Sequence, residues 1–395
     1  MVGPVDYERR DARKMTSANG PKGTSAIVGV GTTPFGKLPG YSADDLGSWA
    51  LYEALSDAAL TVKDIDGLIV NRVSSYEAVA ANLGIQPSWM AQLPSEGRMS
   101  GTSIEMAAMA ISTGLCRRVA LVYGNNGRSA GATYGGVVGE AYGTSADLTA
   151  PYGFTSPGAF YSMMYQRHKY LYGTTDDQLA TVAMTFRHNA SLNENAVMRR
   201  PLSLDEYHNS RYIVEPLHVM DYCLINDGGV ALIMCAADEA ADYPNPPAYV
   251  LGYGQQGQLI NSDFPPGDNW CDATRAVGER TYRMADVKRA DVDALMVYDN
   301  FSPNVLFALE GLGFCEQGEG GDYIQGGRIG IGGELPLNTS GGHLSESYMQ
   351  GWGLTVEAVR QIRRTCGARQ LERTSIIQYV CPSPVVSSII YGSDY

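Results

Sequence analysis

The chain contains two copies of one pattern of buried strands and helices, and this duplication limits the folds it can adopt. Residues 26–31 (AIVGVG) and 249–254 (YVLGYG) are apolar, β-rich runs that each end in glycine. Residues 64–70 (DIDGLIV) and 291–297 (DVDALMV) follow in the two copies, each an acidic turn that leads into a buried strand. We therefore predict two related halves, residues 25–246 and 247–395.

The remaining elements of each half follow in the same order. We expect helices over residues 104–113 and 354–364, strands over 119–123 and 375–379, and closing strands over 229–235 and 385–391. The repeat is therefore β-α-β-α-β-β, twice. Strands that alternate with helices favour an α/β fold in which helices cover both faces of the sheets, and we expect the halves to stack about a pseudo-twofold axis.

Two stretches lie outside this repeat. Residues from about 125 to 218 have no counterpart in the second half, and their Tyr, Gly, Asn and Met content predicts a loop-domain insertion that shapes the substrate pocket. Residues 1–24 read as an N-terminal tail. They have no signal-peptide core, and no apolar run reaches the ~18 residues of a membrane span, so we expect a cytoplasmic protein.

Charge and cysteine usage exclude several classes of partner. The net charge of −13 repels phosphate backbones and anionic membranes, so neither nucleic acid nor a membrane is an expected partner. The seven cysteines are scattered and never form a Cys-x-x-Cys pair, which argues against disulfides or a zinc site. We predict no metal.

Three segments of the second half carry a family resemblance: residues 298–302 (YDNFS), 308–315 (ALEGLGFC) and 336–351 (PLNTSGGHLSESYMQG). They are similar to motifs of the thiolase superfamily, in particular its sterol-carrier-protein type, and the likeness spans residues 25–393. It implies the thiolase fold, a layered αβαβα sandwich.

The resemblance breaks at the catalytic positions. Tyr348 stands where the family has its catalytic His, and Tyr298 stands on the His or Asn that opens the other motif. The family's nucleophilic Cys begins the helix after the second strand of the first half. Here residues 95–106 contain no cysteine, and Gly97 or Gly101 takes its place.

Further candidates come from the same segments. His343 is either an acid–base group or a structural hydrogen-bonding residue, and both readings stay open. Cys381 lies where many thiolases have a second acid–base thiol, but prolines and a serine surround it. The candidate positions for binding substrate or CoA are Gly97, Gly101, Asn300, Ser340, Gly341, Gly342 and Cys381.

Loss of the cysteine changes the possible chemistry. Thiolytic cleavage of a β-keto thioester needs a nucleophile that retains the acyl group. A β-hydroxy thioester can instead break by retro-aldol cleavage, which needs a base for the hydroxyl proton, donors for the enolate oxygen and a proton for the enolate carbon. Two phenols can accept, donate and relay these protons.

This pattern resembles the steroid side-chain-cleaving aldolases. The resemblance implies that a 17-hydroxy steroid carboxyl-CoA is cleaved to a 17-keto steroid and propionyl-CoA, with the CoA thioester as substrate and no cofactor. It also implies a homodimer bound to a zinc-ribbon and OB-fold acyl-CoA-binding partner attached to a hydratase. Two alternatives are a divergent thiolase or acyltransferase that uses another thiol, and a non-catalytic thiolase-like scaffold subunit.

Overall fold

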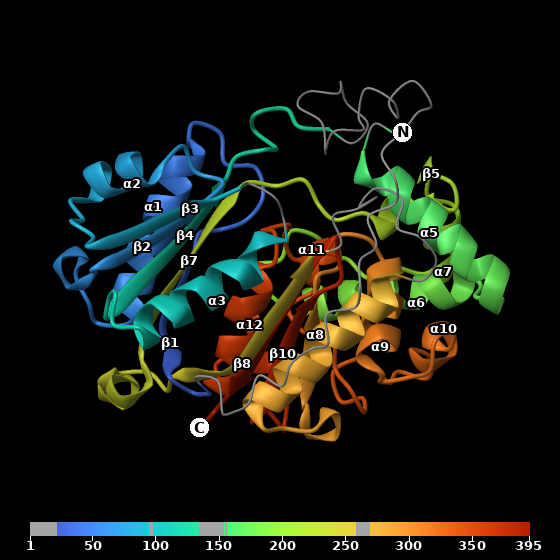
Figure 1. Ribbon diagram of the computed structural model, residues 1–395. Helices are drawn as coiled ribbons and strands as arrows, with labels where there is room; N and C mark the ends of the chain where they lie inside the picture. Colours follow the sequence, from blue (N-terminus) through green and yellow to red (C-terminus); the bar gives the residue numbers. More distant parts are fainter. Residues whose placement is uncertain (1–21, 95–97, 134–153, 155, 258–268) are drawn as a thin grey trace, which may run out of the picture.

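The computed structural model describes residues 22–94, 98–133, 154, 156–257 and 269–395 (Figure 1). Across these residues a nine-stranded mixed sheet runs in the order β3-β2-β4-β7-β1-β8-β11-β10-β9. The first half contributes β1 (Ser25–Thr32), α1 (Ala43–Asp57), β2 (Gly67–Asn71), α2 (Tyr76–Leu83), β3 (Trp89–Leu93), α3 (Met99–Ser112), β4 (Arg118–Asn125) and β7 (Gly228–Ala236). The second contributes β8 (Ala248–Gly257), α8 (Asn269–Ala285), β9 (Ala294–Val297), α9 (Pro303–Leu312), α10 (Gly320–Tyr323), α11 (Gly342–Ser345), α12 (Trp352–Ile362), β10 (Ile376–Cys381) and β11 (Val385–Gly392).

The sheet confirms the predicted duplication. From the centre outwards, the first half runs β1-β7-β4-β2 and the second runs β8-β11-β10-β9, so corresponding strands occupy corresponding places. The halves join where β1 and β8 pair antiparallel, with Ala26 opposite Tyr249 and Ile27 opposite Ala248. Strands β1 and β8 are the corresponding first strands of the two halves, and their antiparallel pairing is what a pseudo-twofold axis between the halves requires. Helix α2 and strand β3 extend the first half beyond the shared pattern.

The predicted acidic turns have the same structure in both halves. Asp64 ends a short 3₁₀ turn before β2, and its carboxylate accepts a hydrogen bond from the Thr61 amide at 2.8 Å. Asp291 does the same before β9, accepting from the Lys288 amide at 2.7 Å. Each carboxylate satisfies an amide at the start of its turn, which explains why both copies of the motif are acidic.

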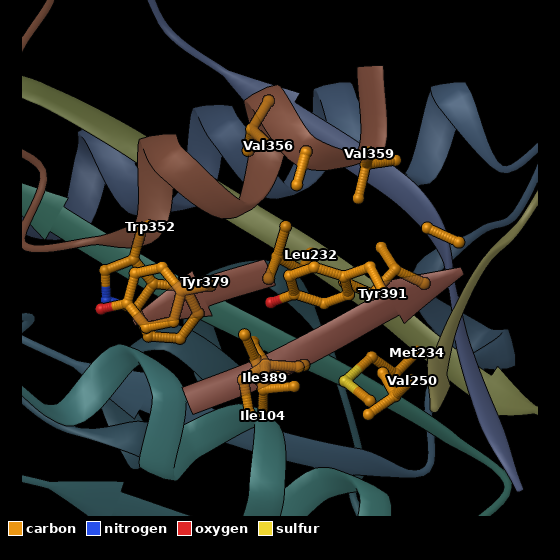
Figure 2. Packing of buried hydrophobic residues seen from close by; sticks show 14 of the residues in the cluster. Ile104, Leu232, Met234, Val250, Trp352, Val356, Val359, Tyr379, Ile389 and Tyr391 are labelled. Atoms are coloured by element: carbon orange, nitrogen blue, oxygen red, sulfur yellow. The ribbon is translucent and has the colours of Figure 1, made fainter. Parts of the chain in front are cut away.

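The packing is layered as predicted for the thiolase fold. Helices α3 and α12 both contact strands of both halves, so they form the middle layer. Helix α1 covers the outer face of the first half, and α8 covers that of the second. Figure 2 shows the middle layer, where Ile104 of α3 and Val356 and Val359 of α12 pack around Tyr391 of β11.

Helix α3 begins at Met99, five residues before the predicted start at residue 104. Its first turn contains Ser100, Gly101 and Thr102, which carry no apolar periodicity, although all three are buried. Hydrophobic periodicity therefore detected only the part of the helix that faces the apolar core.

The chain between β4 and β7 packs on the second half. Its described elements are α5 (Pro157–Tyr172), α6 (Asp176–Ser191), α7 (Leu204–His208), β5 (Tyr212–Val214) and β6 (Leu217–His218). Tyr161 of α5 stacks on Phe301, with ring centroids 4.6 Å apart. The insertion thus reaches the segment that follows β9. Among the described residues, we find no helix with the length and apolar character that a bilayer span requires.

Candidate active site

Two phenols meet at the edge of the second half. Tyr298 follows β9 directly, and Tyr348 follows α11. Their hydroxyl oxygens lie 2.8 Å apart, within hydrogen-bonding distance. Tyr298 is 2% exposed, whereas Tyr348 is half-buried. Residues 50 positions apart in the sequence therefore form one hydroxyl pair, with Tyr298 on its inner side.

Backbone hydrogen bonds hold both tyrosines in place. The Tyr298 amide donates to the Val380 carbonyl on β10 at 2.8 Å. The Tyr348 amide donates to the Asn226 side-chain oxygen at 2.7 Å. Asn226 precedes β7, so the first half positions one phenol and the second half positions the other.

His343 packs against both phenols, with its ring centroid 4.6 Å from that of Tyr298 and 5.2 Å from that of Tyr348, both edge-on. Its Nε2 accepts a hydrogen bond from the Gly351 amide at 2.9 Å. Its Nδ1 lies 3.3 Å from Asp299 Oδ1. Burial lowers the pKa of His343 to about 3. The ring is therefore neutral, and Nε2 is committed as an acceptor.

Asp299 links the segment 298–302 to the segment 336–351 by hydrogen bonds. Its carboxylate accepts the amides of His343 at 2.9 Å and Leu344 at 3.2 Å. Burial raises the pKa of Asp299 to about 7, although these amides act in the opposite direction. Gly342, at φ +59°, must be glycine here, because a Cβ atom would collide with the Asp299 carboxylate.

The pKa of Tyr298 is raised well above its ordinary value, first by burial and then by the neighbouring Tyr348. Tyr298 consequently keeps its proton across the physiological range. A phenol that stays neutral is suited to donating a hydrogen bond to its partner rather than accepting a proton.

Six of the seven predicted binding positions lie within the described residues. The Asn300 carbonyl accepts the Cys223 amide at 2.9 Å, and its side chain accepts from Asn304. Ser340 donates to Glu346 at 2.7 Å. Gly341 is the N-cap of α11. Gly101 lies in the first turn of α3, while Gly97 lies outside the described residues.

Cys381 lies at the end of β10 and is fully buried. Its sulfur is 3.4 Å from the Ser383 hydroxyl. Burial raises the pKa of the Cys381 thiol to about 12, so the thiol is protonated at neutral pH. A protonated thiol is a poor nucleophile.

The structure also places residues near the site that sequence reasoning missed. Tyr161 of the insertion has its hydroxyl within hydrogen-bonding reach of the Asn304 and Asn300 side chains. Arg98 is the N-cap residue of α3, but its side chain makes no capping hydrogen bond. Only the fold reveals Tyr161. Arg98 had a weak signal, as a lone cation just ahead of a helix. Within the described part of the chain, no three His, Cys, Asp or Glu side chains gather to hold a metal.

Comparisons with known proteins agree with this fold. A family model described as thiolase C-terminal domain-like matches residues 266–379. A steroid side-chain-cleaving aldolase of Thermomonospora curvata is 35% identical over 386 residues, covering 94% of this chain and 98% of the relative. A 17-hydroxy-3-oxo-4-pregnene-20-carboxyl-CoA lyase of Mycobacterium tuberculosis is 33% identical, covering 87% and 92%. The solved Ltp2-ChsH2(DUF35) aldolase superposes with a TM-score of 0.87 at 33% identity, covering 94% of this chain and 98% of that one.

Near-full-length identity at this level, together with the duplicated sheet, shows that the chain belongs to the thiolase superfamily. Within that superfamily it is an enzyme of the lyase class, an aldolase.

Proposed function

We propose that this enzyme cleaves a β-hydroxy acyl-CoA by a retro-aldol reaction that forms no covalent cysteine intermediate. The observation that carries the proposal is the hydroxyl pair of Tyr298 and Tyr348, 2.8 Å apart. Residues 98–112, which begin with the cap of α3, contain no thiol to attack a thioester. Proton transfer by the phenols supplies what the reaction needs.

The burial of the two phenols suggests a division of roles. Tyr348 is the less buried and, as the phenolate, receives the β-hydroxyl proton of the substrate, while Tyr298 donates a hydrogen bond to it. The bond between the α and β carbons then breaks. Its electron pair forms the thioester enolate, and the β carbon becomes a ketone. The Tyr348 phenol then gives this proton to the α carbon, which regenerates the phenolate and releases a shorter acyl-CoA.

The names of the relatives support a proposal for the substrate class. Two of them are named for steroid side-chain cleavage and for a 17-hydroxy steroid carboxyl-CoA. We propose the same class here, with a 17-keto steroid and propionyl-CoA as products. The thioester is the substrate, and no cofactor enters the proposed steps.

Single tyrosine substitutions test the reaction. Tyr298→Phe and Tyr348→Phe each remove one hydroxyl and keep the ring, so kcat should fall by about 10²–10⁴-fold. Tyr170→Phe, at a position 84% exposed on α5, is the matched control and should leave kcat unchanged. Release of propionyl-CoA is measured by chromatography, with circular dichroism to check folding. Full activity in both site variants would refute the proposal.

A divergent thiolase remains the rival enzyme, and Cys381 is its candidate thiol. The full burial of Cys381 and its raised pKa, about 12, count against it. The rival predicts an acyl-enzyme that mass spectrometry would trap after incubation with acyl-CoA. The retro-aldol proposal predicts no mass shift.

The partner proposal rests on one solved relative, the Ltp2-ChsH2(DUF35) aldolase. We propose that this chain also binds an acyl-CoA-binding partner with a zinc ribbon and OB-fold, attached to a hydratase. Co-expression followed by tandem purification tests it. A stable complex with raised kcat/KM is expected, and full activity of the chain alone with no complex would overturn it.

A further inference from the structure

One segment of the first half, residues 221–226, forms hydrogen bonds to both site segments of the second half, 298–302 and 336–351. It lies shortly before β7, and we call it the bridging segment. Its hydrogen bonds to the second half join the Ser302 amide to the Asp221 carbonyl (3.0 Å), the Cys223 amide to the Asn300 carbonyl (2.9 Å), the Leu224 amide to the His343 carbonyl (2.9 Å) and the Tyr348 amide to Asn226 Oδ1 (2.7 Å). The bridging segment therefore links the segment that carries Tyr298 to the segment that carries Tyr348.

Asn226 is the residue of the bridging segment that makes its contact with a side chain. It is 0% exposed, its Oδ1 accepts the Tyr348 amide, and its Nδ2 donates to the Asp227 carbonyl at 3.1 Å. Since one partner is a donor and the other an acceptor, the side-chain amide fits in a single orientation. A side chain with no acceptor here would remove the hydrogen bond that holds the Tyr348 backbone.

The first half also fixes the backbone of Asn226. Asn125, the last residue of β4, is 6% exposed, and its Nδ2 donates to the Asn226 carbonyl at 2.8 Å. Asn125 Oδ1 in turn accepts from Arg72 Nε at 3.1 Å and from the Gly127 amide at 3.0 Å. Arg72 directly follows β2. A chain of hydrogen bonds therefore runs from the ends of β2 and β4 through Asn226 to Tyr348.

We propose that Asn226 is a positioning residue for the phenol pair. It fixes Tyr348 so that its hydroxyl meets that of Tyr298, and Asn125 holds Asn226 in place. This inference rests on the proposed retro-aldol function. Asn226 acts through Tyr348 and exchanges no proton with the substrate. Both phenols come from the second half of the chain, and the first half contributes the residue that sets the distance between them.

The distance between the phenols is what makes this position matter for the reaction. Their hydroxyl oxygens lie 2.8 Å apart, and a hydrogen bond between two hydroxyls spans about 2.5–3.0 Å. A shift of Tyr348 by about 1 Å would break the hydrogen bond from Tyr298 and move the proton acceptor away from the substrate hydroxyl. Misplacement on this scale costs about 10²-fold in rate. Because Asn226 acts on the reacting phenol, kcat should change and KM should not.

Variants of the full chain test this role with the 17-hydroxy steroid carboxyl-CoA as substrate. Asn226→Leu nearly keeps the side-chain size but removes both polar atoms, so kcat should fall by about 10–10²-fold with KM within about twofold. Asn226→Asp keeps an acceptor for the Tyr348 amide and should retain several-fold more kcat than Asn226→Leu. Asn125→Asp loses the donor to the Asn226 carbonyl and should also lower kcat, which keeps the test open where Asn226→Leu does not fold. Asn82→Leu, at an exposed position of α2, is the control and should leave kcat unchanged.

Two further measurements separate positioning from a general structural effect. In the Tyr348→Phe background, Asn226→Leu should lower the residual kcat by no more than about twofold, because the hydroxyl that Asn226 positions is gone. Crystal structures of the wild type and of Asn226→Leu measure the distance between the Tyr298 and Tyr348 hydroxyl oxygens. In the variant this distance should exceed about 3.5 Å. The crystal structures require no turnover, so they judge Asn226 even if the substrate is not cleaved.

The outcomes distinguish this inference from the retro-aldol function. A lower kcat with a longer hydroxyl distance, and no further loss in the Tyr348→Phe background, supports both. If the wild type cleaves the substrate but Asn226→Leu keeps its kcat or its hydroxyl distance, the Asn226 inference is wrong and the retro-aldol function stands. An equal loss of kcat in the Tyr348→Phe background leads to the same conclusion. If the wild type is inactive but the distance grows in Asn226→Leu, Asn226 positions the pair and the retro-aldol function is wrong. An inactive wild type with an unchanged distance overturns both.

Discussion

Two groups near the phenol pair, His343 and Asp299, have pKa values far from their ordinary ones. His343 is neutral, with a pKa of about 3, and Asp299 has a pKa of about 7, in each case because burial disfavours the charged form. A histidine whose Nε2 already accepts the Gly351 amide has no free acceptor for a substrate proton. Of the two readings of His343 left open by the sequence, we favour the positioning role.

This reading of His343 makes a prediction. His343→Gln places a side-chain oxygen at the same bond distance from the backbone as Nε2, so it can still accept the Gly351 amide. His343→Leu cannot. We expect the Gln variant to retain several-fold more kcat than the Leu variant. Since His343 is neutral above about pH 3, the Gln variant should show the same dependence of kcat on pH near neutrality as the wild type. If both variants are inactivated equally and the wild-type change in kcat near pH 6–7 disappears, His343 is instead an acid–base catalyst.

At the scale of elements, the close approach of α3 and α12 depends on Gly351. This residue is the N-cap of α12 at φ +89°, and a side chain there would strike Ser100 and the Tyr379 hydroxyl. Gly367 also has a positive φ, +59°, but open space around it. Gly367→Ala should therefore cost only the backbone strain, about 1 kcal/mol, and Gly351→Ala clearly more, with loss of activity. Denaturant unfolding of both variants measures the difference, and equal losses would contradict this account.

Sequence patterns predicted helices and strands well where burial imposes a regular spacing of apolar residues. The runs 26–31 and 249–254 became β1 and β8, and the paired acidic turns became matching 3₁₀ caps. The start of α3 was missed because its first turn is polar or small and is buried against Tyr379 and Ser387 rather than against aliphatic side chains. Motif likeness indicated Tyr298 and Tyr348, but their 2.8 Å contact and the nearby Tyr161 depend on long-range packing that no local pattern encodes.

At the scale of the whole molecule, β3 leaves one edge of the nine-stranded sheet without a partner strand in the described chain. Exposed strand edges favour pairing with another chain, and this edge carries Met90, which is 40% exposed. It is a candidate surface for the homodimer that the family resemblance predicts. Met90→Lys should shift the mass in light scattering from dimer to monomer. Met163→Lys, at a 51% exposed position on α5, should not. Dimers that persist in Met90→Lys would exclude this edge.

Stability of the whole fold should also depend on pH through Glu346, which is buried beside Glu357. Burial first, and then the Glu357 charge, raise the pKa of Glu346 from 4.5 to about 7. The folded state therefore binds more protons than the unfolded chain between these pH values. With respect to this group, stability is greatest below pH 4.5 and falls as pH rises towards 7.

In Glu346→Gln, the amide can accept from Asn193 and donate to Ser340, replacing both present contacts. We expect this variant to be more stable at pH 8 by about 1–3 kcal/mol and to lose that part of the pH dependence. Urea unfolding from pH 5 to 8 measures the effect, with the exposed Glu372→Gln as control. A variant that is destabilised equally at every pH would show instead that Glu346 is ionised and stabilising in the folded protein.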